Sequence, residues 1–254
     1  GELATHSEDH RRLGGAPADV QRTRLARTHG ALATLAGQRV RGLRPPEEQF
    51  DVATLAEWQA LGGTYVFANN NGRCACPEVV DAAGRRLVLM ARVSDDDYIT
   101  VRRARIRQPA QLAELHHDGW EKARALGGLY ILSYHSNMLA RPTTVAALGL
   151  MARTLKADTS AWLVTTGEVA EWWVARSAME TTTAARGDTL LVRVRNAAPT
   201  ATPAVGVLVS LPDGRAPREG ATATPGGARV AVPALQPGES REFTVILEAA
   251  RHAP

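Results

Sequence analysis

The sequence has few lysines, few cysteines and no long apolar segment. Of its 30 basic residues only Lys122 and Lys156 are lysines, and the arginines form no basic stripe with interleaved aromatic residues. Nucleic acid is therefore not an expected partner. The two cysteines, Cys74 and Cys76, are too close for an easy disulfide and too few for a thiolate zinc site. No apolar run is long enough to cross a bilayer, so neither a transmembrane segment nor a signal peptide is expected within these 254 residues.

The residues that are present favour a large folded protein. With 254 residues, 44% of them hydrophobic, the chain can bury a sizeable core in one large domain or two. Apolar strand-like runs alternate with segments of helical period up to about residue 178. The predicted strands cover 63–70, 85–94 and 129–137, and the predicted helices cover 51–63, 108–128, 143–155 and 165–179. This alternation predicts a parallel β/α architecture with the site on loops that follow the strands.

The pattern changes after residue 178. Apolar and polar residues then alternate with period two, and turn signals such as Asp-Gly and Pro-Gly-Gly separate the runs. We therefore predict an α/β domain over 1–178 and a small Ig-like, all-β sandwich domain over 179–254 that carries no catalytic group.

His6 and His10 stand four residues apart at the start of the chain. On a helix they would lie on one face, where two imidazoles can share a metal ion. Ser7 replaces the glutamate that follows the first histidine in zinc proteases, which excludes that class. Two exposed histidines on a polar turn are the other interpretation. For His116 and His117, on a predicted helix without partners at metal spacing, we expect a solvated face.

Further candidate residues follow the predicted strands. They are Arg44-Pro45-Pro46, the acidic run 95–97 and His135. A β/α barrel places catalytic groups at such positions. Each also has a structural interpretation: an extended loop imposed by the prolines, a solvated turn, and a buried histidine at a strand end.

This order of motifs resembles the polysaccharide deacetylase family, the NodB-homology carbohydrate esterases. The matching segments are residues 1–3 and 6–10 (G-x-E-[IL] and H-[ST]-x-x-H), Arg44-Pro45-Pro46 (R-x-P), Asp96-Asp97-Tyr98 (the acidic-aromatic motif) and His135 (L-x-H). The resemblance covers residues 1 to about 180 and implies a partial NodB-type (β/α) barrel. Two features depart from the family. Its first motif, which ends a strand with Asp-Asp, is absent from this chain, and Ser133 stands where the L-x-H motif has leucine.

The resemblance implies a metal centre. His6 and His10 would ligate a divalent metal, expected to be zinc, and the third ligand would be an aspartate of the absent first motif. Ser7 would hold the metal-binding turn in place. The metal would polarise the scissile carbonyl and lower the pKa of bound water.

The resemblance also implies the acid–base groups. Arg44 would orient the base aspartate, and Asp97 would brace either Arg44 or His135. His135 would be the acid that protonates the leaving amine, kept charged by that carboxylate. Pro45 and Pro46 would contact the substrate.

Three functions remain open at this level. The first is a metal-dependent hydrolase that removes N-acetyl groups from a GlcNAc-containing polysaccharide. The second is a catalytically inactive carbohydrate-binding homologue, and the third is a related barrel hydrolase acting on a non-sugar amide. A polymeric substrate suggests a secreted or cell-envelope protein. The residues 68–84, expected to be a specificity loop, contain no decodable motif.

Overall fold

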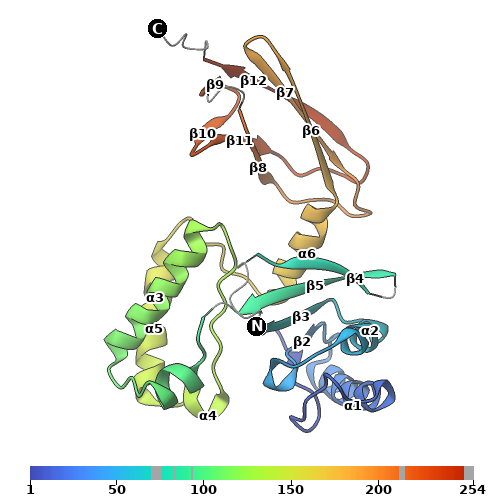
Figure 1. Ribbon diagram of the computed structural model, residues 1–254, viewed down its shortest axis with the longest axis vertical. Coiled ribbons are helices and arrows are strands. Elements are labelled where there is room, and N and C mark those ends of the chain that lie inside the picture. Colours follow the sequence, from blue (N-terminus) through green and yellow to red (C-terminus); the bar gives the residue numbers. More distant parts are fainter. Residues whose placement is uncertain (70–75, 83, 93, 212–214, 249–254) are drawn as a thin grey trace. The chain divides into compact units, whose positions relative to one another are not determined.

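The chain folds as two compact units, Gly1–Ala170 and Glu171–Pro254, in the computed structural model (Figure 1). The structure describes residues 1–69, 76–82, 84–92, 94–211 and 215–248, so Cys74 lies outside the described residues. The division falls inside helix α6 (Thr166–Ser177), and the first strand of the second unit, β6, begins at Met179.

The N-terminal unit contains a five-stranded sheet in the order β1-β2-β3-β5-β4. Its strands are β1 (Ala4–Thr5), β2 (Gly42–Leu43), β3 (Tyr65–Asn69), β4 (Glu78–Ala82) and β5 (Arg85–Arg92). β1, β2, β3 and β5 are parallel, and only β4 runs antiparallel to its neighbour. The predicted strands at 63–70 and 85–94 are confirmed. Because parallel strands end at one edge, the loops after Thr5, Leu43 and Arg92 share that edge.

The predicted strand at 129–137 is wrong, since residues 129–135 carry no strand in the structure. The cause is β4, which forms within the expected loop 68–84 and pairs with β5, Val79 opposite Val88. This hairpin occupies the edge that a further parallel strand would need. The segment still crosses the end of β5, because Ser94 Oγ donates to the Ile131 carbonyl at 3.0 Å.

Two helices cover the sheet, the first in contact with β1 and the second with β4 and β5. They are α1 (Ala18–Ala36) and α2 (Val52–Ala60), and α2 begins with a capping box formed by Asp51 and Thr54. The shared core contains Leu13, Leu25, Val40, Leu43, Trp58, Val66 and Leu87. Gly42 is required in β2, because a Cβ there would lie 2.1 Å from the Tyr65 ring. The predicted helix over 51–63 is confirmed.

A second group of helices follows β5. It contains the π-helical segment η2 (Tyr98–Arg103), α3 (Pro109–Ala125), α4 (Ser136–Leu139) and α5 (Pro142–Ala157), with α3 and α5 side by side (Figure 1). Proline at the first position suits the start of α3 and α5. The predicted helices at 108–128, 143–155 and 165–179 are confirmed.

The expected solvated face of α3 is wrong for His116. Its side chain is buried, and its Nε2 is hydrogen-bonded to the Tyr134 hydroxyl. His117, one position on, lies at the surface with Glu121 3.9 Å away. Adjacent helical residues point in different directions, so one histidine can enter the core while its neighbour stays in water.

The C-terminal unit consists of two antiparallel sheets. They are β6-β7-β12-β9 and β10-β11-β8, formed by Met179–Arg186, Thr189–Asn196, Ser240–Leu247, Pro217–Glu219, Thr222–Thr224, Gly227–Val232 and Val205–Val209 in that order. Alternate residues of β7 and β11 are buried, as period two requires. Both sheets contribute to one core, with Val192 and Val245 from one and Val209 and Val230 from the other. This packing is that of a β-sandwich. Among the described residues, no helix is both long and apolar enough to span a membrane.

Candidate functional site

The histidine pair lies on the loop after β1. Residues 6–10 are not helical, so the helical premise for their spacing is wrong. The loop bends sharply because Ser7 (φ 65°) and His10 (φ 55°) both adopt left-handed backbone conformations, which are uncommon for residues other than glycine. The two rings nevertheless meet edge to face, with centroids 4.8 Å apart.

His6 is held in one tautomer by the loop after β2. Its Nδ1 lies 2.7 Å from the carbonyl oxygen of Arg44, and because a carbonyl only accepts, Nδ1 carries the hydrogen. Partial desolvation of the ring lowers the pKa of His6, with nearby His10, Arg44 and His135 adding to the effect against the opposing hydrogen bond. The ring is therefore neutral near pH 7, with the lone pair on Nε2. A carbonyl bond to the other ring nitrogen is typical of metal-binding histidines.

Ser7 lies in the middle of the same bend. Its backbone N–H donates to the hydroxyl of buried Thr5 at 3.3 Å, which ties the loop to the end of β1. The Ser7 hydroxyl is buried and has no hydrogen-bond partner among the described residues. The main chain of Ser7 thus stabilises the bend, while its side chain leaves one polar atom available.

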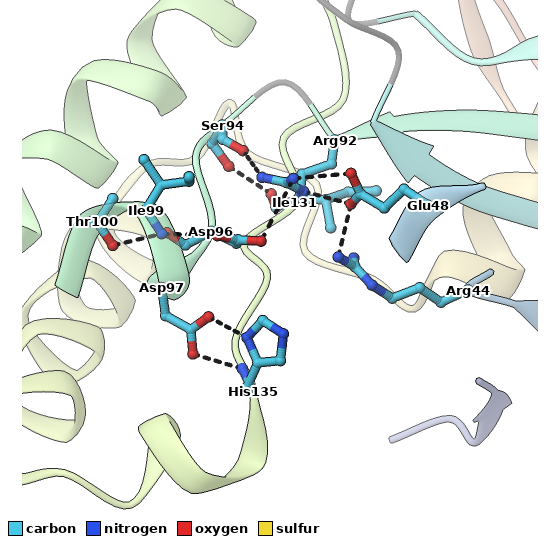
Figure 2. Close-up of polar contacts among 10 residues, drawn as sticks. All are labelled: Arg44, Glu48, Arg92, Ser94, Asp96, Asp97, Ile99, Thr100, Ile131 and His135. Carbon is cyan, nitrogen blue, oxygen red and sulfur yellow. Dashed lines mark hydrogen bonds and ion pairs between the residues drawn. The ribbon is translucent and has the colours of Figure 1, made fainter. Parts of the chain in front are cut away.

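Asp97, which directly precedes η2, and His135, which directly precedes α4, form a close pair (Figure 2). One oxygen of Asp97 lies 2.5 Å from Nδ1 of His135, and the other accepts the His135 backbone N–H at 2.7 Å. The Asp97 side chain is 0% exposed, whereas that of His135 is 49% exposed. Of the two partners expected for Asp97, the structure gives it His135. The carboxylate fixes the ring so that Nε2 is left for a ligand or substrate.

Arg44 has a different carboxylate partner (Figure 2). Its Nη2 donates to Glu48 Oε1 at 2.8 Å, and its guanidinium lies over the Phe67 ring at 4.7 Å. Glu48 also accepts two hydrogen bonds from Arg92, at 2.9 and 3.1 Å. Burial lowers the pKa of Arg44, with adjacent Arg92 contributing. The Nη1 atom of Arg44 is buried without a partner in the described part of the chain.

Pro45 and Pro46 shape the loop that carries Arg44. Both are buried, Pro45 in an extended conformation and Pro46 at the start of the short turn η1 (Pro46–Glu48). Their contact with a substrate stays a prediction. In the structure they restrict the backbone between Arg44 and Glu48.

The histidine pair meets part of what a divalent metal requires. His6 and His10 provide two imidazoles in contact, and His6 has the tautomer and the neutral state that a metal ligand needs. A catalytic zinc site uses three protein ligands. No group of three histidine, cysteine or acidic residues suited to a metal occurs among the described residues. The residues present therefore fit two of the ligand positions.

Glu48 and Arg92 were missed by sequence reasoning. Glu48 follows the R-x-P motif by two positions, and Arg92 ends β5. An arginine directly after the apolar run 87–91 could have suggested a buried ion pair. Its partner could not have been found, because it lies 44 residues away in sequence.

The geometry can now be compared with known proteins. Residues 1–66 match the family model for polysaccharide deacetylase, a segment that contains His6, His10 and Arg44. A solved protein from Mycobacterium smegmatis, assigned as a polysaccharide deacetylase, has a TM-score of 0.62 and 25% identity, with 69% of this chain and 64% of that one covered. The N-terminal unit is polysaccharide deacetylase-like.

Two further structures share this deacetylase-like fold at 17% identity. A protein from Pseudomonas aeruginosa PAO1, also assigned as a polysaccharide deacetylase, has a TM-score of 0.58, and the allantoinase PuuE has a TM-score of 0.59. Each comparison covers 68% of this chain and 59% of the other. This chain thus spans roughly three fifths of these structures. No curated protein sequence matches it significantly.

Proposed function

We propose that this chain is part of a metal-dependent hydrolase that removes N-acetyl groups from a GlcNAc-containing polysaccharide. The observation that supports this most directly is the Asp97–His135 pair, in which a fully buried carboxylate orients a half-exposed imidazole. His6 follows β1 and Asp97 follows β5, two strands of the same sheet whose parallel order brings these loops to one edge. The deacetylase match over residues 1–66 supports the same class of reaction.

The reaction needs an acid and a base in fixed places. The base takes a proton from water as the water oxygen bonds to the acetyl carbonyl carbon, the C–N bond then breaks, and acetate and the amine leave. An amine leaves poorly unless it is protonated, so the nitrogen must receive a proton as the bond breaks. His135 would donate it from Nε2, because its Nδ1 is engaged by Asp97. Arg44 would hold the base carboxylate through its unpaired Nη1.

His6 and His10 would hold the metal, with zinc the first expectation. When bound, the metal supplies polarisation of the acetyl carbonyl and a lowered pKa for water. The test is metal content, measured on the wild type and on a His6→Ala/His10→Ala double variant. We expect the double variant to lose the metal, while a His117→Ala control retains it. Equal metal content in the wild type and the double variant would remove the hypothesis.

A carbohydrate-binding homologue without catalysis is the second candidate. It applies if the full-length protein supplies no third metal ligand beside His6 and His10, since the described residues contain no group of three such ligands. Such a protein would bind the glycan and leave its acetyl groups in place.

Acetate release separates the two candidates. The full-length protein would be incubated with oligomers of N-acetylglucosamine, and both acetate and new amines would be quantified. Equal amounts of the two products are expected from a deacetylase. Glycan binding without either product would favour the second candidate. Because polymeric glycans lie in and outside the cell envelope, we propose that the protein acts there.

A further inference from the structure

Glu48 occupies a strained position beside the proposed site. Glu47 (φ 52°) and Glu48 (φ 59°) are consecutive non-glycine residues in the left-handed region. This conformation is unfavourable for side chains with a Cβ, and it persists only where surrounding contacts enforce it. The two residues follow Pro45 and Pro46, so the whole loop after Arg44 is conformationally restricted.

The contacts that enforce it come from two arginines (Figure 2). Arg92 binds both oxygens of Glu48 through Nε and Nη2, and the Nη2 of Arg44 shares Oε1. All three side chains are largely buried, with exposures of 7% for Arg92, 16% for Glu48 and 19% for Arg44. Burial alone would lower the pKa of Arg92, but the hydrogen bond to Glu48 and the negative charge of Glu48 raise it, and the net shift is upward.

This geometry determines the direction of Arg44. Glu48 binds Nη2 at one end of the guanidinium, and the Phe67 ring covers one face of it. The Nη1 atom is left as the donor without a partner in the described part of the chain. A guanidinium is planar, so fixing Nη2 and one face also fixes where Nη1 points. Without Glu48, the guanidinium groups of Arg44 and Arg92 would lose the carboxylate that they share, while the 3.7 Å ion pair of Arg92 with Asp96 would remain.

We propose that Glu48 is a positioning residue, clamped by Arg92, that aims the Nη1 of Arg44 at the reacting groups. This inference rests on the proposed function for its effect on turnover. Its structural content, the orientation of Arg44, is independent of any substrate. Arg92 also lies 3.7 Å from Asp96, the neighbour of Asp97, so the clamp connects the Arg44 loop to the loop that carries the Asp97–His135 pair.

The test uses Glu48→Gln in the full-length protein with Glu47→Gln as the matched control. Glu47 has the same backbone conformation but pairs with Arg12 at the surface. Substrate-independent NMR of the arginine side-chain nitrogens is measured first. We expect separate, slowly exchanging Nη signals for Arg44 in the wild type and in Glu47→Gln, and averaged signals in Glu48→Gln. Unchanged Arg44 signals in Glu48→Gln would overturn the proposal.

Turnover is measured second. For Glu48→Gln we expect kcat to fall roughly ten- to a hundredfold, the usual range for residues that orient catalytic groups, with KM within about twofold. Glu48→Asp retains a carboxylate and should recover part of the loss. A wild-type kcat in Glu48→Gln would contradict the proposal. If the wild type releases no acetate, the proposed function fails while the NMR result still decides the role of Glu48. If Glu48→Gln does not fold, the NMR and turnover measurements are made on Glu48→Asp instead. We then expect partly averaged Nη signals for Arg44, because the shorter side chain restrains it less. Unchanged Arg44 signals in Glu48→Asp would contradict the proposal.

Discussion

The deacetylase-like unit and the β-sandwich use backbone strain differently. All the described non-glycine residues with positive φ lie in the first unit, and four of them are in the site loops: Ser7, His10, Glu47 and Glu48. In the described part of the sandwich, positive φ occurs only at glycines, which adopt it without steric cost. Strain that surrounding contacts must enforce is typical of functional sites. From this contrast we expect the chemistry in the first unit and structural support in the second.

The ion pairs on the site loops differ from the exposed pair of Arg195 and Glu180 in the sandwich, although the sandwich also contains a largely buried arginine, Arg215, which is 10% exposed and pairs with Asp188. In the first unit, Arg92 with Glu48 and His135 with Asp97 each include a largely or fully buried member on a site loop. In the sandwich, Arg195 and Glu180 are exposed by 51% and 58%. Buried pairs are costly to assemble and strongly destabilising to break, whereas exposed pairs contribute little. Mutations in the two units should therefore have different consequences.

The largest expected effect is that of His135→Ala on turnover. Removing the acid should lower kcat by roughly 10²–10⁴-fold, equivalent to about 2.7–5.4 kcal/mol in the barrier. KM should change little, and metal content should not change. Steady-state kinetics of acetate release is the measurement, with His117→Ala as the matched surface control. Wild-type turnover in His135→Ala would place the acid elsewhere.

A core mutation in the sandwich should change the free energy of unfolding by about as much as His135→Ala changes the reaction barrier. Leu190 is buried in β7, so Leu190→Ala should reduce the free energy of unfolding of the sandwich by about 2–5 kcal/mol. The kcat of the folded protein on a small soluble oligosaccharide should stay at the wild-type value. Denaturant unfolding and kinetics on the same preparation check both parts. Loss of kcat in protein that is still folded would show that the sandwich contributes to catalysis.

Lowering the pH should reduce the stability of the first unit more than that of the second. Burial lowers the pKa of His116 from 6.5, so below about pH 6.5 the unfolded chain binds a proton that the native state does not. Stability therefore falls as the pH drops from 6.5 toward the lower native pKa, and His6 contributes with the same sign. The described part of the sandwich contains no histidine.

The measurement is the free energy of unfolding at pH 7 and pH 5. His116→Gln should reduce the difference between the two values, although it also changes a buried hydrogen bond. His117→Gln, the matched surface control, should leave the difference unchanged. An equal pH dependence in both variants would contradict the assignment to His116.

The smallest expected effect is that of an exposed pair in the sandwich. Glu180→Gln removes the partner of Arg195 and should change the free energy of unfolding by less than about 1 kcal/mol. Thermal unfolding at low and high salt checks this, because screening should remove even the small difference. A larger loss of unfolding free energy would show that this exposed pair stabilises the sandwich as strongly as a buried ion pair would.

Much of the fold was predictable because it depends on local periodicity. The helices α2, α3, α5 and α6 and the alternating strands of the sandwich follow from spacing within a few residues. The failure at 129–137 came from a competing hairpin, β4, whose pairing with β5 no local pattern in 129–137 reveals. The buried His116 was likewise unpredictable, since its partner Tyr134 comes from outside its helix.

For the candidate site, the sequence and its resemblance to the deacetylase family proposed His6, His10, Arg44, Asp97 and His135 as candidates. Their types suit metal ligation and acid–base chemistry, and they follow strands or a segment that was expected to be one. Only the tertiary structure decided that Asp97 pairs with His135 and that Glu48 joins Arg44 to Arg92. The Glu48 contacts join residues up to 44 positions apart, because parallel strands bring the loops after β2 and β5 to one edge of the sheet. His135 reaches Asp97 on a segment without strand structure that crosses the end of β5.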